Sequence, residues 1–494
     1  MTINKPNWLR LETLCLFASA KTGSKKSFLV LNRIVKQYLN QNNKMKSTRR
    51  TFLKSASTAG LGALFIPNFI KDPPSTKLRF AMIGVGARGR ASWSQVAVED
   101  IVAMCDVDDR MTEHAYKTVP NAKKYKDFRV MFDEMANEID AVMIATPDHT
   151  HFPAAMAAMQ LGKHVLVEKP LVHNIWQCRT MKKAANHYGI VSQMANQGHT
   201  THGIRLVKEW YDAGVLGDVK EVIRWGGPTT FNPDGYFSKP EGFPFPEHEV
   251  PEGLDWDLWK GPAADRPFNN EYAPKSWRAF YDFGSGAMAD WCCHTLDAPF
   301  WALDLGMPHT VDAVVPNPEV PDHSMIAKES TITWQFGARG NKPPVTMKWI
   351  EGMGKPELKE EYGLEEMPDN GMIMIGSKKT LYHGGRPNNP RLLVPEEEWI
   401  DFQKNKPAET IPRVAEEKPV QEWVAAIKND TLPGSNFDYG ADLTEMGLVG
   451  VLAQRFGGTI SYDAKNMKAV GRPELDAYIN EPVREGWSYG EDLW

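Results

Sequence analysis

The chain has 494 residues, of which 42% are hydrophobic and 24% charged, and it carries a formal net charge of −5 at pH 7. This composition is typical of a folded globular protein of two or three domains, and it excludes a disordered or collagen-like chain. The first 70 residues hold twelve Lys and Arg but a single acidic residue, which leaves a formal charge of −16 on the remainder. A basic surface for nucleic acid is therefore not expected in the body of the protein.

Residues 1–77 are predicted to be a leader and not part of a domain. The run Thr48–Lys54, TRRTFLK, is followed over residues 55–70 by a weakly hydrophobic stretch that is too short to span a bilayer stably. This pattern is similar to a twin-arginine export signal, with Met45 as a candidate true start. We expect a periplasmic protein that the twin-arginine translocation machinery exports in folded form, with no membrane span in the mature chain. The alternative is a disordered basic tail.

A glycine-rich turn follows the leader. The apolar run Phe80–Ile83 leads directly into Gly84, Gly86 and Gly89, which are spaced GxGxxG. Gly84 permits a tight turn, Gly86 lets a diphosphate approach the backbone, and Gly89 allows close packing of helix on strand. Unpaired amides at the start of the next helix would face the phosphates. The pattern predicts a dinucleotide-binding loop.

Asp106 ends the next apolar run, twenty-two positions after Gly84. A carboxylate at this strand end can accept hydrogen bonds from ribose hydroxyls and would repel a 2′-phosphate, which favours NAD over NADP as the cofactor. Arg88 is a further candidate cofactor contact, and with Arg90 it keeps NADP open as the less favoured cofactor.

Apolar runs and helical patterns alternate from Leu78 to Asn196, as a parallel sheet with crossover helices requires. We expect an α/β domain over residues 78–196, with the doubly wound parallel sheet of a Rossmann fold, in which ligands bind at the carboxyl ends of the strands. Strands are predicted at 78–84, 100–106, 140–146, 163–168 and 190–195, with a short one near 124–125, and helices near 89–98, 109–118, 128–137, 150–161 and 174–188.

Two of these strand ends carry the segments Ala145–Phe152, ATPDHTHF, and Val167–Leu171, VEKPL. With these motifs the chain resembles the glucose-fructose oxidoreductase, inositol dehydrogenase and rhizopine catabolism family, usually written Gfo/Idh/MocA, over essentially everything after residue 77. Glu168, Lys169 and Pro170 form the most diagnostic tripeptide of that family. The bond between Lys169 and Pro170 is a candidate cis peptide.

The resemblance implies roles for residues at both strand ends. In the family, the lysine of this motif contacts the reacting sugar hydroxyl and the nicotinamide ribose, so we expect the same of Lys169. A lysine at a strand tip can also stabilise charge that develops on a substrate oxygen. The histidines of the first segment could instead cap the helix that follows. The remaining candidates for the cofactor site are Thr146, Pro147, His151 and Glu168.

From residue 197 onward, longer strands and many aromatic residues predict a second, α+β domain over residues 197–494, built on a large, open, mostly antiparallel sheet. The Pro- and Gly-rich stretch 226–274 is a predicted loop that could close over a ligand. Its Trp256 and Trp259 could stack on a sugar or pack in a core. The open sheet of such a domain commonly buries a face in a subunit contact, so we expect a homo-oligomer.

The second chemical motif is GSGAMADWCCHTLD, residues 284–297. Asp290 and His294 are spaced i, i+4 and share one face of a helix, with Asp297 on nearly the same side. In the resembling family an Asp-x-x-x-His pair at this point supplies a sugar-binding acid and the general base, and imidazole suits removal of a hydroxyl proton at neutral pH. A core histidine is the alternative. We expect catalytic roles for Lys169, His294 and Asp290, and substrate binding by the same three residues and Trp291.

The cysteines show neither the spacing of a disulfide framework nor a CxxC motif. The adjacent Cys292 and Cys293 are predicted to be free, buried thiols, with a metal or redox pair as the alternative. His199 and His202 form an HxxH, but no third ligand has convincing spacing, so no metal is expected.

These features predict an enzyme: an exported NAD-dependent oxidoreductase that transfers a hydride between a carbon of a sugar or glycoside and a tightly bound nicotinamide cofactor. One alternative is an NAD-dependent glycosidase that acts through a transient 3-keto sugar. Export favours it because it needs no second redox partner, but the run ADWCCHTLD does not match the Tyr- and His-bearing motif that we associate with that group. The other alternative is a non-catalytic exported sugar-binding protein.

Overall fold

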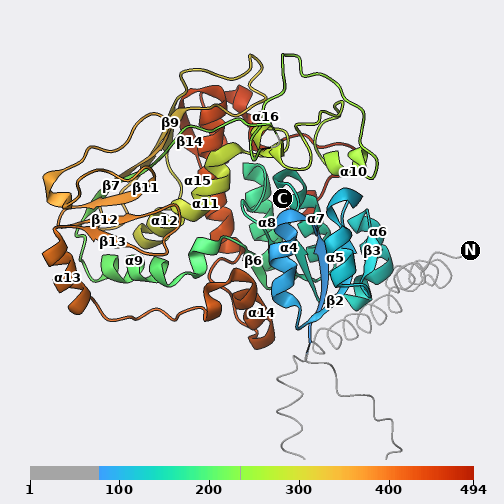
Figure 1. Ribbon diagram of the computed structural model, residues 1–494, viewed down its shortest axis with the longest axis horizontal. Coiled ribbons are helices and arrows are strands. Elements are labelled where there is room, and N and C mark those ends of the chain that lie inside the picture. Colours follow the sequence, from blue (N-terminus) through green and yellow to red (C-terminus); the bar gives the residue numbers. More distant parts are fainter. Residues whose placement is uncertain (1–76, 234) are drawn as a thin grey trace, which may run out of the picture. The chain divides into compact units, whose positions relative to one another are not determined.

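The computed structural model describes residues 77–233 and 235–494 (Figure 1). The predicted export signal at Thr48–Lys54 lies outside the described residues. Within the described ranges, no helix has both the length and the apolar character needed to cross a membrane.

The first domain contains a six-stranded sheet in which all neighbouring strands are parallel. Its strand order, β3-β2-β1-β4-β5-β6, is that of a doubly wound sheet, so the predicted Rossmann architecture is confirmed. The strands are β1 (Arg79–Ile83), β2 (Asp100–Cys105), β3 (Lys123–Tyr125), β4 (Ala141–Ile144), β5 (His164–Val167) and β6 (Ser192–Met194).

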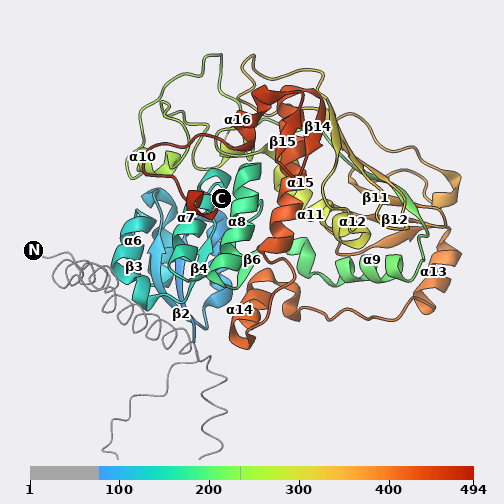
Figure 2. The ribbon, with the colours of Figure 1, turned by 180° about the vertical axis from the view of Figure 1, so that it is seen from behind.

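Helices connect these strands and cover the sheet on both faces (Figures 1 and 2). The first two are shorter than predicted because short 3-10 turns, at 94–96 and 109–111, take up part of their length. The helices are α4 (Ala87–Trp93), α5 (Glu113–Thr118), α6 (Phe128–Met135), α7 (Asp148–Gln160) and α8 (Ile175–Tyr188).

Strand β1 shows why the sequence runs apolar without interruption into the glycine turn. Ala81 and Ile83 belong to one buried cluster, whereas Phe80 and Met82 belong to another. Because successive side chains of a strand point to opposite faces, each face of the sheet receives an apolar layer. The polar and glycine residues that follow the strand are thereby left at the edge of the sheet.

The second sheet has nine strands in the order β13-β12-β11-β7-β10-β9-β8-β14-β15. All neighbouring pairs in it are antiparallel except β7 with β10, so the predicted large, mostly antiparallel sheet is confirmed. Its strands are β7 (Val219–Gly226), β8 (Thr310–Val314), β9 (Ser330–Phe336), β10 (Val345–Glu351), β11 (Gly371–Gly376), β12 (Thr380–His383), β13 (Arg391–Leu393), β14 (Gly458–Asp463) and β15 (Lys468–Val470).

Helices α11 (Gly286–Thr295) and α15 (Phe437–Phe456) pack against each other beside this sheet. The indole nitrogen of Trp334, on β9, donates to the carbonyl oxygen of Met446 at 3.1 Å, which ties α15 to the sheet. A Cβ on Gly447 would lie 2.5 Å from Cys292 Sγ, so glycine at this position allows the two helices to approach closely. The sheet and α15 together position α11, which carries the second chemical motif.

Later segments of the chain return to the first domain. Trp423 donates to the carbonyl oxygen of Val191 at 3.0 Å, and Trp494 donates to Thr180 Oγ1 at 3.0 Å. Buried residues of both domains therefore form one continuous core. The remaining helices are α9 (His202–Asp212), α10 (Trp256–Lys260), α12 (Asp297–Leu303), α13 (Glu396–Lys404), α14 (Pro419–Asn429) and α16 (Asp476–Ile479).

Candidate active site

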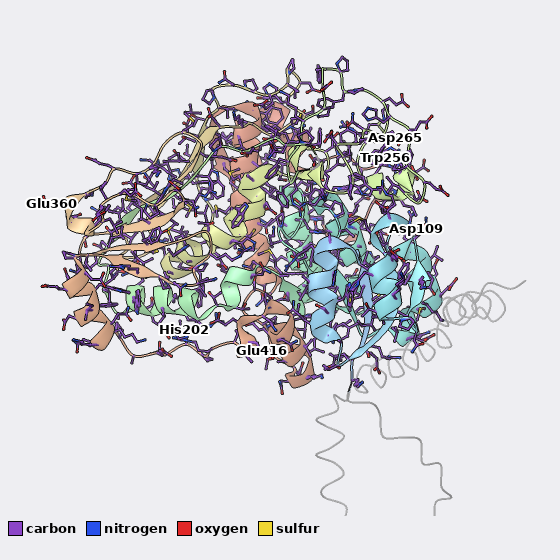
Figure 3. All side chains as sticks on the ribbon, viewed as in Figure 1. Asp109, His202, Trp256, Asp265, Glu360 and Glu416 are labelled. Atoms are coloured by element: carbon purple, nitrogen blue, oxygen red, sulfur yellow. The ribbon has the colours of Figure 1, made fainter. Side chains whose placement is uncertain are left out.

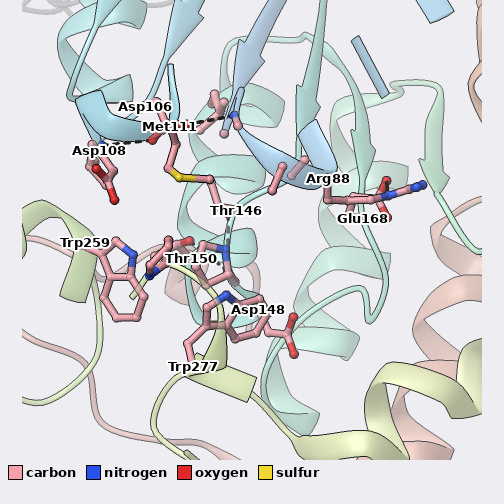
Figure 4. A pocket seen from close by; sticks show the side chains of 18 of the residues that line it. Arg88, Asp106, Asp108, Met111, Thr146, Asp148, Thr150, Glu168, Trp259 and Trp277 are labelled. Atoms are coloured by element: carbon pink, nitrogen blue, oxygen red, sulfur yellow. Dashed lines mark hydrogen bonds and ion pairs between the residues drawn. The ribbon is translucent and has the colours of Figure 1, made fainter. Parts of the chain in front are cut away.

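A cleft of about 660 Å³ lies at the carboxyl ends of β1, β2, β4 and β5. This is the edge of a doubly wound sheet at which a ligand is expected. Helix α11 and parts of the segment 226–274 line the cleft from the second domain, and Figure 4 shows side chains around it. All the residues that the sequence analysis assigned to the site line this cleft except Gly89 and His151.

The glycine loop forms one wall of the cleft and leaves little room for side chains. Gly84 has a φ of +79°, and a Cβ there would lie 2.7 Å from the carbonyl oxygen of Ala145. A Cβ on Gly89 would lie 2.0 Å from the carbonyl oxygen of Gly84, in agreement with the predicted close approach. At Gly86 the obstacle is Met111, whose Cβ would be 2.7 Å away. The loop is therefore a backbone cradle of the kind that a diphosphate requires.

Asp106 lines the cleft beyond the end of β2 and is already bonded to the backbone. Its Oδ2 accepts hydrogen bonds from the amides of Val85 at 2.9 Å and Gly86 at 3.4 Å, and its Oδ1 accepts one from the amide of Asp108 at 3.1 Å. Burial raises the pKa of this carboxyl, and the three amides oppose that shift. Because a carboxylate can accept about four hydrogen bonds, Asp106 can hold the glycine loop and still accept one from a ribose hydroxyl.

Three carboxylates line the end of the cleft around Asp106, which we call its acidic end; Lys126 lines it too, and Asp108 and Asp127 are paired with Arg110 and Arg129. Arg88, which kept NADP open as the cofactor, donates instead to Glu168 at 2.7 Å (Figure 4). Asp106 has no ion pair in the described chain, so its carboxylate fits the unphosphorylated ribose of NAD and disfavours the 2′-phosphate of NADP.

Glu168 offers a second test of whether the cleft suits a dinucleotide. Its carboxyl group is buried, and Oε1 accepts hydrogen bonds from Arg88 and from Ser92 Oγ at 2.9 Å. The other oxygen, Oε2, is buried without a hydrogen-bond partner in the described part of the chain. A buried oxygen without a hydrogen bond lowers the stability of the folded protein, unless a ligand supplies a donor, as a ribose hydroxyl can. Together with the glycine cradle, the residues present fit NAD.

Residues 250–261, which we call the cofactor strap, cross from the second domain to the acidic end of the cleft. The amide of Asp109 donates to the carbonyl oxygen of Gly253 at 3.0 Å, and the amide of Asp255 donates to the carbonyl oxygen of Val107 at 2.9 Å. Figure 3 shows Asp109 and the strap residue Trp256 on neighbouring segments. The predicted closing loop is therefore fastened to the strand end that carries Asp106.

The strap also brings aromatic side chains to the site. Trp259 lines the cleft, and its carbonyl oxygen lies 2.9 Å from His149 Nε2. Trp256 stacks behind it, with ring centroids 5.0 Å apart. Trp487, from the C-terminal tail, lines the same cleft. The strap tryptophans thus divide between the two predicted roles, since Trp259 reaches the cleft and Trp256 packs against its neighbours.

The two predicted chemical motifs meet in the cleft. Lys169 follows β5, and its Nζ forms an ion pair with Asp290 Oδ1 on α11. It also donates to the carbonyl oxygen of Asp290 at 3.2 Å, and the bond that joins Lys169 to Pro170 is cis. Burial alone would raise the pKa of Asp290, but Lys169 and Arg278 lower it to about 2. Asp290 is therefore an anion at neutral pH and holds the Lys169 ammonium in the cleft.

Tyr236 and Arg278 complete this group and were not singled out by any sequence motif. The hydroxyl of Tyr236 donates to the Asp290 carboxylate, and Arg278 Nε lies 3.5 Å from Asp290 Oδ1. The Arg278 guanidinium also lies over the Tyr236 ring, 4.3 Å from its centroid. Tyr236 lies in an irregular connection and Arg278 in a short 3-10 turn at Ser276–Ala279, where neither hydrophobic periodicity nor spacing marks a functional side chain.

His294 lies one helical turn after Asp290 and lines the same cleft. The side chain is 2% exposed, and its Nδ1 is buried with no hydrogen-bond partner among the described residues. Burial lowers the pKa of His294 well below its ordinary value, and the charges of Lys169 and Arg386 lower it further. The imidazole is therefore neutral at pH 7 and can accept a hydrogen bond or a proton from a substrate hydroxyl.

Asp148, the first residue of α7, is a further titratable group in the cleft. It is 5% exposed, and burial raises its pKa to about 7 against the opposing charges of Arg278 and Lys169. A carboxyl group with this pKa exchanges protons readily at neutral pH. The only signal in the sequence was its position directly after Pro147, in the segment that carries the family resemblance.

The other candidates from that segment divide into two groups. Thr146 and Pro147 line the cleft. His151 does not, because its ring nitrogens lie 3.0 Å from the carbonyl oxygen of Pro170 and 2.9 Å from that of Thr146. Burial lowers the pKa of His151 to about 4, so the ring is neutral and links the loops that follow β4 and β5. The residue before α7 is Pro147, so neither histidine caps this helix.

The structure places Asp297 away from the cleft, because α11 ends at Thr295 and α12 begins at Asp297. Asp297 accepts a hydrogen bond from Asn196 Nδ2 at 2.9 Å and lies 3.0 Å from His199 Nδ1. In the described ranges, 77–233 and 235–494, no group of three or more His, Cys, Asp or Glu could hold a metal ion. Cys292 and Cys293 are free and buried, as predicted.

The first domain is doubly wound and carries a dinucleotide cradle, and the α+β domain adds an Asp and a His beside a strand-end Lys. The chain belongs to the Gfo/Idh/MocA oxidoreductase family. The family model described as an oxidoreductase family with an NAD-binding Rossmann fold matches residues 78–196, and the model of its C-terminal alpha/beta domain matches residues 200–340. Together the two models cover more than half of the chain, and the cofactor is NAD.

Curated relatives match part of the chain. A glycosyl hydrolase family 109 protein of Parabacteroides distasonis is 29% identical over 206 residues, which cover 35% of this chain and 43% of the relative. The levoglucosan dehydrogenase of Pseudarthrobacter phenanthrenivorans is 26% identical over 153 residues, which cover 29% of this chain and 39% of the relative. The chain thus matches less than half of the length of these relatives.

A solved structure shares the fold over most of the described chain. It is that of the WlbA dehydrogenase from Bordetella pertussis in complex with NADH and UDP-GlcNAcA. Its TM-score is 0.53 at 17% identity, and the match covers 78% of this chain and 97% of that one. At this identity the likeness shows that the two proteins share a two-domain fold.

Proposed function

We propose that this protein is an exported NAD-dependent oxidoreductase that removes a hydride from a hydroxyl-bearing carbon of a sugar or glycoside. The observation that carries the proposal is the meeting of Lys169 with Asp290 and His294 in the cleft that the glycine loop lines. NAD, when bound, supplies the hydride acceptor. The names of the curated relatives, a family 109 glycosyl hydrolase and a levoglucosan dehydrogenase, support a carbohydrate substrate.

The residues that meet in the cleft suit the proton transfer that oxidation of an alcohol requires. The Lys169 ammonium can donate to the substrate oxygen and stabilise the charge that develops on it. The neutral ring of His294 can accept the hydroxyl proton, and Asp148 offers a nearby carboxyl with a pKa of about 7 that can take the proton onward. Asp290, an anion at neutral pH, can accept a hydrogen bond from a neighbouring hydroxyl of the sugar.

A second candidate is redox-neutral cleavage of a glycoside, in which oxidation of the sugar is transient. The cofactor strap favours it, because its backbone hydrogen bonds at Gly253 and Asp255 cover the acidic end of the cleft and would slow exchange of the cofactor. A retained cofactor must be restored in place. In this reaction Tyr236 would serve as a hydrogen-bond donor, since burial and Asp290 raise its pKa and keep it protonated.

Export and assembly belong to the proposal on the strength of the sequence. The run Thr48–Lys54 and the short apolar stretch after it support passage through the twin-arginine route to the periplasm. A protein exported in folded form can carry its cofactor with it, which agrees with a strap that retains NAD. The open second sheet supports a homo-oligomer.

The experiment is a substrate screen on the NAD-loaded protein. A panel of sugars and aryl glycosides is added, and both the reduced-nicotinamide absorbance and the release of the aryl group are followed. A lasting rise in absorbance supports net dehydrogenation, whereas aryl release without a lasting rise supports redox-neutral cleavage. The proposed function fails if no sugar or glycoside produces either signal.

A further inference from the structure

A second cavity of about 540 Å³ opens beside the catalytic cleft, and we call it the side cavity. Trp291 and Arg386 line both spaces, so the two cavities adjoin at these side chains. Trp291 lies on α11 between Asp290 and His294, and Arg386 lies in the connection from β12 to β13. A group bound beside Arg386 in the side cavity would therefore lie next to a ligand in the catalytic cleft.

The guanidinium of Arg386 has no ion pair or hydrogen bond with any residue of the described chain, and its Nε is buried. Burial and the charge of Arg88 lower the pKa of Arg386, which shows that its surroundings oppose the cation. The arginine nevertheless stays protonated in proteins. The guanidinium is partly buried and lies 5.1 Å from the centroid of the Trp291 ring, and because it has no ionic partner, an anionic ligand could bind it bidentately.

Two acidic residues of the catalytic cleft, Asp290 and Glu168, are already engaged by other cations. Lys169 forms an ion pair with Asp290, and Arg278 also contacts that carboxylate. Glu168 is paired with Arg88. These pairs leave Arg386 without an ion pair among the described residues, and no acidic residue lines the side cavity.

The connection that carries Arg386 is held in place by its neighbours. Thr295 Oγ1 donates to the carbonyl oxygen of Gly385 at 2.8 Å. A Cβ on Gly203 would lie 1.8 Å from the carbonyl oxygen of Pro387, so α9 packs directly against this backbone. A guanidinium on a fixed connection loses little freedom when it binds a ligand, as a preorganised site requires.

The rest of the side cavity suits an anion and its sugar. Arg224 adds a second guanidinium, which lies 3.6 Å from the centroid of the Trp349 ring. Burial lowers the pKa of Arg224 to about 10, so it is charged at neutral pH. Further lining residues are amides and aromatic rings, which bind sugar hydroxyls and C–H faces: Asn370, Asn388, Asn389, Trp225 and Trp291.

We propose that the side cavity binds an anionic group of the substrate, a carboxylate, sulfate or phosphate, through Arg386 with the help of Arg224. The preferred substrate is then an acidic sugar, or a glycoside whose neighbouring unit is acidic. This inference rests on the proposed function, because it concerns the substrate of the same cleft.

The test compares matched neutral and acidic ligands on the NAD-loaded protein. Cellobiose and glucose are paired with cellobiouronic acid, glucuronic acid, glucose 6-sulfate and glucose 6-phosphate, and both calorimetric affinity and kcat/KM are measured. At least one acidic ligand should bind about tenfold or more tightly than its neutral partner, with an affinity that falls as salt is added. The three acidic groups distinguish a carboxylate site from a sulfate or phosphate site.

The variant Arg386→Met should lose this preference, so that an acidic ligand binds no more tightly than its neutral partner, and it should still fold because the guanidinium has no ion pair or hydrogen bond within the described chain. Arg391→Met removes a guanidinium that is paired with Glu396 outside both cavities and should leave the preference intact. Equal binding of neutral and acidic ligands, or a preference that survives in Arg386→Met, overturns the inference. Arg386-dependent binding without turnover upholds it and counts against the proposed function alone.

Discussion

The hydroxyl of Tyr236 lies 3.0 and 2.9 Å from the two carboxylate oxygens of Asp290, so the loop predicted to close over a ligand reaches the charged centre of the site. The phenol can hold Asp290 in position or pass its hydrogen bond to a substrate oxygen. In either role it acts through one donor, and Asp290 keeps Lys169 and Arg278 as partners when that donor is removed.

We therefore expect Tyr236→Phe to lower kcat/KM by about tenfold and to change the free energy of unfolding by less than about 1 kcal/mol. Steady-state kinetics and urea denaturation check the two parts. Tyr125→Phe is a matched control, because it removes an exposed hydroxyl that donates to Glu134 on the first domain. Unchanged kinetics in Tyr236→Phe would exclude the phenol from the reaction.

Asp148 should link stability to pH. Burial raises its pKa from 3.8 to about 7, so between pH 4 and 7 the folded protein holds a proton that the unfolded chain has released. The free energy of unfolding therefore falls as the pH rises through this window, and the loss is complete above pH 7. Asp148→Asn cannot ionise and should be more stable than the parent at pH 8 by about 1–4 kcal/mol, with little difference at pH 4.

Urea denaturation at pH 4, 6 and 8 measures this difference, with the exposed Asp212→Asn as the control. The same Asp148 variant should lose activity, since it lacks the carboxyl that takes the proton onward. Parallel stability profiles for the parent and Asp148→Asn would show that this carboxyl does not titrate near pH 7.

Gly253 is the position at which the cofactor strap can be loosened with a small change. It has a φ of +89°, and a Cβ there would lie 3.3 Å from the Asp109 Cβ. Gly253→Ala should therefore destabilise the strap and its hydrogen bond to Asp109 by about 1 kcal/mol or more. Bound NAD should then dissociate faster, by about fivefold or more. Gly242→Ala introduces similar backbone strain at φ +78° where the added Cβ meets open space, and it should not alter dissociation. Release of NAD into an excess of a competing nucleotide gives both rates.

The parts of the fold that could be predicted are those in which one local pattern carries the information. The apolar run into Gly84 predicts β1, the turn and the cradle, because a strand buried on both faces must be apolar throughout. Residues 290 and 294 were predicted to share a helical face for the same reason, since helical spacing is local. The meeting of Lys169 with Asp290 could be expected only through the family resemblance, because 121 residues separate them.

The residues that could not be predicted reach the site through tertiary structure alone. Tyr236 and Arg386 lie on irregular connections and Arg278 on a short 3-10 turn, and all three reach the cleft only because the fold places α11 beside the end of β5. The prediction that Asp297 shares the helical face of Asp290 and His294 was wrong. Helical spacing does not apply there, because α11 ends before Asp297 and α12 begins with it. For Asp106, the sequence predicted a ribose contact but not the hydrogen bonds to the glycine loop, which depend on how the turn places its amides.

The most direct test follows the reduced-nicotinamide absorbance after the NAD-loaded protein is mixed rapidly with a sugar that it converts. The parent should develop the band, and Lys169→Ala and His294→Ala should develop it at least about 100-fold more slowly while they retain NAD. Lys208→Ala, which removes a half-buried lysine paired with Asp212 on α9 and outside the cleft, should behave as the parent does. If Lys169→Ala and His294→Ala develop the band at the parent rate, the cleft is not the site of proton transfer.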